Sequence, residues 1–335
     1  MSKIKVGISI GDPNGIGVEI ILSAFEDKSL FNNLTPIIFS PKKIIEFNKS
    51  YFKKKNDINH ISNLFNCEEN RLNVVNFDSE GFEVEFGKKS KIAGSISKIS
   101  LLHATKAIRK NKIDTLVTSP INKNSIQSWD FKFTGHTDFL GDNFSGKPLM
   151  FMINRELRVA LLTDHIPLNK VAGALSAVSL NIKIKKVFES LTKDFSIEKP
   201  RVAVLSLNPH SGDCGVIGNE DDKIIRPLIN KLQSKDLSIE GPFAADSFFG
   251  SQKYKSFDAT LAIYHDQGLI PFKTLSFGKG VNFTAGLDIV RTSPDHGTAF
   301  DIAGKGIAKS NSFKEAILES VRIFKSREQY SNRLK

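Results

Sequence analysis

The chain contains only two cysteines, Cys67 and Cys214, among its 335 residues. Two cysteines far apart are too few for a disulfide framework, so we expect a protein of a reducing compartment. No run of 18 apolar residues occurs, which argues against a membrane-spanning helix. The opening residues MSKIKVGISIGDPNG also lack the apolar core and cleavage site of a signal peptide. These absences predict a cytoplasmic protein.

A compact basic block with interleaved aromatic residues is also missing, although the formal net charge is +11. The lysines are scattered in short groups, as at 42–43, 53–55 and 183–186. Such scatter is typical of a lysine-rich, solvated surface and not of a nucleic-acid patch. We therefore expect neither a nucleic acid nor a membrane as a partner.

Apolar runs of strand and helix type alternate along the chain. Strand-like runs occupy 4–10, 35–40, 114–121, 201–209 and 259–268, and helical spacing marks 18–25, 41–54, 183–195 and 313–329. This alternation predicts an α/β fold with mostly parallel sheets. The length favours two domains. The segment from about 60 to 90 is irregular, and we expect short strands and loops there.

Polar clusters follow several of the predicted strands directly. They are GDPNG, TSPINK, TDH, NPHSGD and YHDQG. In open α/β sheets ligand sites gather at the carboxyl ends of the strands. Clusters on separate strands can therefore converge on one cleft.

Three histidines lie in these clusters: His165, His210 and His265. Three imidazoles with open coordination positions form a normal catalytic site for zinc or another divalent metal. A carboxylate that could orient the ring lies close to each in sequence, at Asp164, Asp213 and Asp266. The spacing is no signature, so hydrogen-bonded histidines at strand ends are the competing interpretation. Cys214 could be a fourth ligand, although a small buried cysteine is the commoner role.

Two glycine-rich stretches are further candidates. GDPNGIG does not have the GxGxxG spacing, so a tight strand-to-helix turn explains it as well as a phosphate cradle does. Asp12 and Asn14 could still point into a cleft. The polar stretch 278–306 predicts a long functional loop or a run of turns. Lys273, Asn282 and Arg291 could bind a phosphate or carboxylate, or could be surface groups.

The ordered motifs resemble those of the 4-hydroxythreonine-4-phosphate dehydrogenase family of pyridoxine 5'-phosphate biosynthesis. They run from residue 7 to about 306 and include GISIGDPNGIGVEI, VTSPINK, FTGHTDFL, LLTDHIPL, LNPHSGDCGVIGNED, GPFAADSFF and YHDQGLIPFK. The last motif contains PDHGTAFDIAGKG, which is similar to the cofactor loop of isocitrate and isopropylmalate dehydrogenases. The resemblance implies their fold, with two α/β/α domains and a cleft between them. We place the first domain at 1–130 plus 270–335, and the second, with the dimer interface, at 131–269.

The resemblance also implies roles for individual residues. The metal ligands would be His165, His210 and His265, in a site shared between the two chains of a homodimer. Substrate contacts would be His136, Thr137, Lys273, Asn282 and Arg291. The loop with His296, Gly297, Thr298 and Asp301 would lie near the dinucleotide. Asp246 or Asp266 could assist proton removal or orient a ligand histidine, and the sequence does not choose between them.

The implied reaction is NAD-dependent oxidation of 4-phosphooxy-threonine. The product, 2-amino-3-oxo-4-phosphooxybutanoate, would lose carbon dioxide to give 3-amino-2-oxopropyl phosphate. The divalent ion would be zinc, cobalt or magnesium. Relatives that oxidise 4-phospho-threonate or 4-phospho-erythronate are one alternative. A metal-dependent phosphatase and a non-catalytic binding protein are the others.

Overall fold

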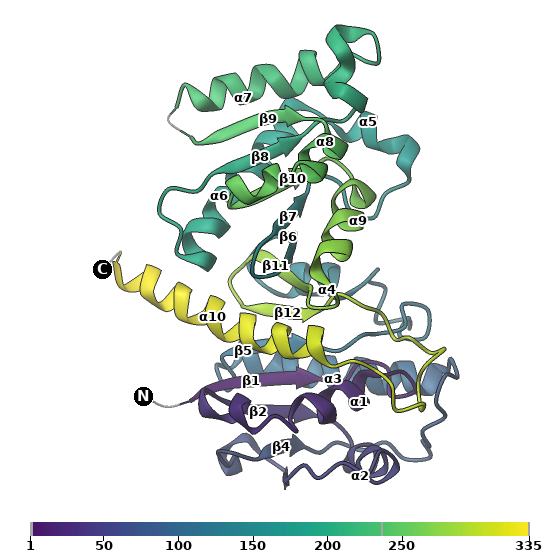
Figure 1. Cartoon of the computed structure of the whole chain (residues 1–335). Coiled ribbons are helices and arrows are strands. Elements are labelled where there is room, and N and C mark those ends of the chain that lie inside the picture. The colour runs from purple at the N-terminus through teal and green to yellow at the C-terminus, as the bar shows by residue number, and fades with distance from the viewer. Residues whose placement is uncertain (1–2, 236, 334–335) are drawn as a thin grey trace. The chain divides into compact units, whose positions relative to one another are not determined.

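The computed structural model describes residues 3–235 and 237–333. The chain divides into two compact units, shown in Figure 1. Unit 1 comprises Met1–Gly146 and Leu287–Phe324, and unit 2 comprises Lys147–Gly286 and Lys325–Lys335. Both boundaries lie later in the chain than the expected 130/131 and 269/270. One reason is that Phe139 and Leu140 of the 136–143 helix are buried in the same core as Leu101 and Phe131.

Unit 1 contains a parallel sheet in the strand order β3-β4-β2-β1-β5-β12. The strands are β1 (Ile4–Ser9), β2 (Leu34–Phe39), β3 (Ile58–Ile61), β4 (Leu72–Val75), β5 (Thr115–Thr118) and β12 (Arg291–Pro294). The helices are α1 (Gly17–Ala24), α2 (Lys42–Tyr51), α3 (Lys91–Arg109), α4 (His136–Asn143) and the first part of α10 (Asn311–Arg333), with short 3-10 turns at Lys28–Asn32 and Leu64–Asn66. Strands β2 and β4 are buried along their whole length, as expected of a covered parallel sheet.

Unit 2 has the strand order β11-β6-β7-β10-β8-β9. The strands are β6 (Gly146–Ile153), β7 (Arg158–Leu161), β8 (Val202–Leu205), β9 (Ile239–Phe243), β10 (Ala259–Ala262) and β11 (Val281–Leu287). The helices are α5 (Val171–Ala174), α6 (Ala177–Phe195), α7 (Arg226–Gln233), α8 (Ala245–Gly250) and α9 (His265–Ser276), with short turns at Leu168–Lys170, Pro209–Gly215, Asp221–Ile225 and Lys253–Ser256. Strands β7, β10, β8 and β9 are parallel, and β6 pairs with β7 in the antiparallel sense.

Local sequence explains several element ends. Ser90 begins α3 because its hydroxyl accepts a hydrogen bond from the amide of Ala93. Ser176 and Ser179 form a reciprocal capping box at the start of α6. At its far end α10 is fixed to unit 2, where Arg327 forms an ion pair with buried Asp194. The last residues of the chain's final helix therefore belong with unit 2.

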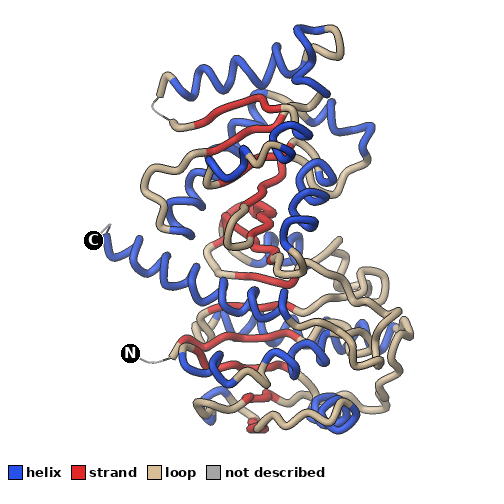
Figure 2. Tube along the Cα trace, viewed as in Figure 1, coloured by secondary structure: helices blue, strands red, loops and turns tan. Residues whose placement is uncertain are grey.

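The predicted α/β class with mostly parallel strands is confirmed. The prediction of a long loop or a run of turns for 278–306 holds for 295–306 but is wrong for 281–294, because β11 and β12 lie there. A buried polar side chain is tolerated in a strand when it forms a hydrogen bond inside the protein. Thr292 is an example, because its hydroxyl donates to the carbonyl of Ala316 at 2.7 Å. Figure 2 shows that loops of unit 1 gather at the end of the strands where β1 and β12 terminate. Among the described residues, no helix combines the length and apolar character needed to cross a bilayer.

Candidate functional site

The reversal of strand order in unit 1 lies between β1 and β5. From β1 the chain crosses to β2 on one side, whereas β5 pairs with β1 on the other. GDPNG follows β1 and SPINK follows β5, so both motifs lie at this switch point. Crevices at such points are the usual ligand sites of open α/β sheets.

A buried, positively charged side chain lies beside this switch point. Arg291, the first residue of β12, is 2 % exposed, and its Nε and Nη2 donate to Thr118 Oγ1 at 3.1 and 2.6 Å. Burial lowers the pKa of Arg291 to about 9, which still leaves the guanidinium charged at neutral pH. A buried positive charge of this kind favours an anionic ligand.

His136 is the first residue of α4 and belongs to the same charged neighbourhood. Its Nε2 is buried and has no hydrogen-bond partner among the described residues, although the residue as a whole is only half-buried. Burial, followed by the positive charges of Arg291 and Lys123, holds the pKa of His136 well below its usual value. The ring is therefore neutral at pH 7 and could donate one hydrogen bond to an anion. Thr137 follows it and is half-buried as well.

The GDPNG turn packs against the loop that follows β12. Thr298 O accepts from the amide of Ile16 at 3.1 Å, and a side chain at Gly15 would come within 2.8 Å of the same oxygen. Asp12 and Asn14 are buried, at 1 % and 0 % exposed, so neither points into an open cleft. The glycine at 15 is thus required by close backbone approach, which leaves the 298 loop directly against the turn.

Asn14 also explains part of the irregular 60–90 region. Its side chain accepts from the amide of Glu85 at 2.9 Å and donates to the carbonyl of Lys88 at 2.8 Å. Phe86 lies against Gly304 in the loop after β12. Residues 85–88 therefore support the 298–306 loop, a role that we could not predict because nothing in the local pattern marks it. The other predicted members of the loop are His296, which is half-buried, and the exposed Gly297 and Asp301.

In unit 2, two of the predicted metal ligands lie side by side. His165 follows β7 and His265 begins α9 after β10; these strands are parallel neighbours, so both histidines lie at the same sheet edge. Their ring centroids are 5.6 Å apart. Asp266 Oδ1 lies 2.7 Å from His265 Nδ1, which leaves Nε2 of that ring for another ligand.

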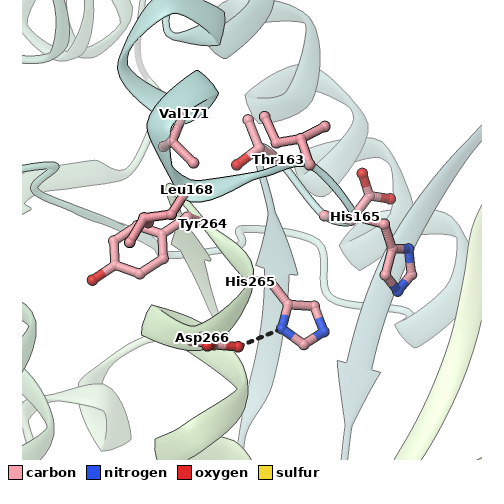
Figure 3. A pocket seen from close by; sticks show the side chains of 9 residues that line it. Thr163, His165, Leu168, Val171, Tyr264, His265 and Asp266 are labelled. Carbon is pink, nitrogen blue, oxygen red and sulfur yellow. Dashed lines mark hydrogen bonds and ion pairs between the residues drawn. The ribbon is translucent and has the colours of Figure 1, made fainter.

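Figure 3 shows these side chains around a cavity of about 290 Å³. Its lining also includes polar and apolar residues of both loops: Thr163, Asp164, Ile166, Leu168, Val171 and Tyr264. Imidazoles that share an ion through bonds of about 2 Å have ring centres roughly 5 Å apart. The spacing and donor chemistry of His165 and His265 therefore fit a divalent ion.

His210 follows β8, the other neighbour of β10, but the structure does not bring it together with His165 and His265 in one metal-binding group. Among residues 3–235 and 237–333, no group of three or more His, Cys, Asp or Glu side chains could hold a metal. His210 is exposed on the turn Pro209–Gly215. Cys214, in the same turn, is exposed instead of buried, and its backbone is left-handed.

The remaining predicted residues of unit 2 lie outside the histidine cavity. Asp246 is exposed on α8, and Lys273 is exposed on the third turn of α9. Asn282 is half-buried in β11, and its Oδ1 is buried with no partner among the described residues. Of the two candidate carboxylates, only Asp266 contacts a histidine. Sequence reasoning missed Thr118 and Lys123, although both belong to a motif that it singled out.

Comparisons with known proteins show which family the chain resembles. Residues 32–319 match the family model described as pyridoxal phosphate biosynthetic protein PdxA. A 4-hydroxythreonine-4-phosphate dehydrogenase of Bacteroides thetaiotaomicron is 42% identical over 98% of this chain and 91% of its own length. A protein of Oceanobacillus iheyensis, provisionally named D-threonate 4-phosphate dehydrogenase, is 32% identical over 96% of this chain and 98% of its own.

Solved structures match across nearly the whole chain. The 4-hydroxythreonine-4-phosphate dehydrogenase of Klebsiella pneumoniae gives a TM-score of 0.82 at 29% identity and covers 97% of this chain and 98% of its own. An isocitrate dehydrogenase of Methylococcus capsulatus gives 0.50 at 13% identity over 98% and 89%, a likeness of fold alone. The predicted family and fold relationship are confirmed. The chain belongs to the PdxA family of pyridoxal phosphate biosynthetic proteins.

Proposed function

We propose that this chain oxidises the secondary hydroxyl of 4-phosphooxy-threonine with NAD as the hydride acceptor. The product would be 2-amino-3-oxo-4-phosphooxybutanoate, which decarboxylates to 3-amino-2-oxopropyl phosphate. The observation that carries the proposal is the pair His165 and His265, 5.6 Å apart at a cavity, in a chain of this dehydrogenase family. Within unit 1, the buried guanidinium of Arg291 beside the switch point is the group proposed to bind the anionic part of the substrate.

The proposed metal site combines His165 and His265 with His210. A divalent ion bound there would act as a Lewis acid on the substrate oxygen in both steps. Asp266 holds the His265 ring through Nδ1, so that Nε2 stays unprotonated and available. Zinc, cobalt and magnesium remain the candidates, and imidazole ligands favour the first two.

We assign the phosphate or carboxylate of the substrate to Arg291 and His136, because both present N–H groups in a buried, positively charged environment. Thr137, Lys273 and Asn282 are proposed as further substrate contacts. The loop of His296, Gly297, Thr298 and Asp301 is proposed to lie at the dinucleotide. Asp266 is the better supported of the two candidate bases, because Asp246 has no contact with a histidine among the described residues.

A cytoplasmic homodimer would complete the metal site with residues of both chains. The segments that follow His165 and His210 expose large apolar side chains, with Leu168 at 71%, Val216 at 82% and Ile217 at 42%. Exposed apolar groups beside an incomplete site are typical of a protein interface. These exposed residues lie within 131–269, the part of the chain in which the dimer interface is proposed.

The deciding experiment is a coupled assay with 4-phosphooxy-threonine and NAD, run with and without a chelator. Metal-dependent growth of NADH absorbance is expected. D-Threonate 4-phosphate, tested in parallel, addresses the alternative suggested by the Oceanobacillus relative. A much higher kcat/KM for that substrate would replace the proposed one. Release of phosphate without NADH would indicate a phosphatase instead, and a metal-free, inactive protein a binding role.

A further inference from the structure

The turn that carries His210 has an unusual backbone. Residues 210–214 are all left-handed, with φ values of 52° at His210, 55° at Ser211, 81° at Gly212, 43° at Asp213 and 53° at Cys214. Only glycine adopts this region without steric cost, and four of these residues are not glycine. A run of this kind persists only where surrounding contacts fix it.

One buried carboxylate fixes the backbone directly before this run. Asp221 is 0 % exposed and begins the turn Asp221–Ile225. Its Oδ1 accepts from the amide of Leu207 at 2.8 Å, and its Oδ2 accepts from the amide and the side-chain Nδ2 of Asn208, both at 3.0 Å. The carboxylate thus fixes the two backbone amides that lie just before Pro209 and His210.

Neighbouring residues close the turn from the other side. The amide of Ile217 donates to the carbonyl of Gly212 at 3.0 Å, and a side chain at Gly212 would come within 2.6 Å of Gly218 O. Glu220 Oε2 accepts a second hydrogen bond from Asn208 Nδ2 at 2.9 Å. The segment 217–221 therefore encloses the left-handed turn, with Asp221 as its buried anchor.

We propose that Asp221 is a positioning residue, which holds the 207–214 backbone so that the exposed imidazole of His210 is presented to the divalent ion. The inference rests on the proposed function, since it takes His210 as a metal ligand. Asp221 itself touches neither ion nor substrate in this account. Its effect passes through the two amides and Asn208.

The test is titration of the metal-free full chain with Co²⁺ alone, followed by the visible absorption of the bound ion. Asp221→Asn replaces one accepting oxygen by a donor, so one of its bonds to the 207–208 amides or to Asn208 is lost. Loss of an outer partner of a metal ligand typically weakens metal affinity about 10- to 100-fold, and we expect at least a tenfold loss here with an altered spectrum. Circular dichroism checks that the fold is retained.

Asp222→Asn is the matched control, because Asp222 is the next residue in the same turn and contacts exposed Arg226 instead. Its Co²⁺ affinity should stay within about twofold of the wild type. If Asp221→Asn does not fold, Asn208→Ala decides: it keeps the carboxylate but removes the Nδ2 bonds, and an intermediate loss of affinity is expected.

The inference would be overturned if the folded Asp221→Asn variant kept the wild-type Co²⁺ affinity and spectrum. If only Asn208→Ala folds, the same result in that variant would overturn it. His210→Ala separates this failure from a failure of the proposed function. If His210→Ala binds Co²⁺ as the wild type does, His210 is not a ligand, and both the metal assignment and the positioning role are refuted. If it loses affinity while the positioning variants do not, only the positioning role is refuted.

Discussion

The two units prepare their candidate sites in different ways. In unit 1 the candidate anion-binding group is buried and already bonded to its own chain, since Arg291 donates to Thr118. In unit 2 His165 and His210 are exposed, and half-buried His265 begins α9 with its Nδ1 2.7 Å from Asp266 Oδ1. A site held by internal bonds is preorganised for an anion, whereas the histidine site would need the proposed ion and the proposed second chain to become complete.

The strongest test of this contrast is His265→Ala. Loss of a metal ligand removes a transition-state interaction of several kcal/mol, so turnover should fall by roughly a thousandfold or more. Metal content of the purified variant should fall as well. Prolonged chelation of the wild type should reproduce the loss, and added Zn²⁺ or Co²⁺ should restore activity. Full activity in the chelated protein would show that the histidine site does not depend on an ion, and the contrast between the two sites would then fail.

Arg291→Lys tests the preorganised site. Lysine keeps the charge but cannot reproduce the planar fork that bonds Thr118, and charge-assisted hydrogen bonds contribute about 1.5–3 kcal/mol each. We expect kcat/KM for the phosphorylated substrate to fall roughly 10- to 100-fold, mainly through KM. Metal content should be unchanged. A selective loss of kcat with unaltered KM would contradict the anchoring role.

Gly15→Ala tests the loop of unit 1 that contains Thr298 and is proposed to lie at the dinucleotide. The new methyl group would lie 2.8 Å from Thr298 O, so the loop must move away from the GDPNG turn. Displacement of a binding loop by a fraction of an ångström should raise KM for NAD roughly tenfold. Gly250→Ala, where a methyl group meets nothing within 4 Å, serves as the control in a steady-state titration of NAD.

The remaining prediction is on stability instead of activity and concerns Asp12. Burial raises the pKa of Asp12 from its ordinary 3.8 to about 6. The folded state therefore binds its proton more tightly than the unfolded state, and ionisation above pH 6 opposes folding. Asp12→Asn keeps the acceptor for the Asn14 amide and should stabilise the protein above pH 6 by at most about 3 kcal/mol.

This gain should shrink as pH falls from 6 toward 4, where the wild-type carboxyl becomes protonated in both states. Thermal unfolding of both proteins at pH 4.5 and pH 8 measures it. An equal shift at the two pH values would show that ionisation of Asp12 is not the cause.

His136 gives the free energy of unfolding a pH dependence of the opposite sign to that of Asp12. Its pKa is lowered in the folded state, so the unfolded state takes up the proton first as pH falls. Its contribution is complete above pH 6.5 and is lost as pH falls toward the lowered pKa. The matched comparison of Asp12→Asn with wild type at each pH cancels that contribution, since both proteins retain His136.

Much of the fold was predictable from local patterns. The runs 35–40 and 259–268 became β2 and β10 with the start of α9, because continuous apolar residues bounded by turn residues specify covered parallel strands. The segment 278–306 misled the prediction, because polar side chains in it are buried within strands, as Thr292 of β12 is, whose hydroxyl donates to a carbonyl of α10. Residues 85–88 gave no local signal, since their role depends on Asn14, which is remote in sequence.

By itself the sequence determined the family, the α/β class and the residue types at the strand ends, because these depend on periodicity and on ordered local motifs. Only the tertiary structure decided which of those residues meet. It paired His165 with His265 through adjacent parallel strands, buried Arg291 beside Thr118, and placed His210 on a left-handed turn anchored by Asp221. Such contacts join positions far apart in the chain, and no local pattern encodes the distance between them.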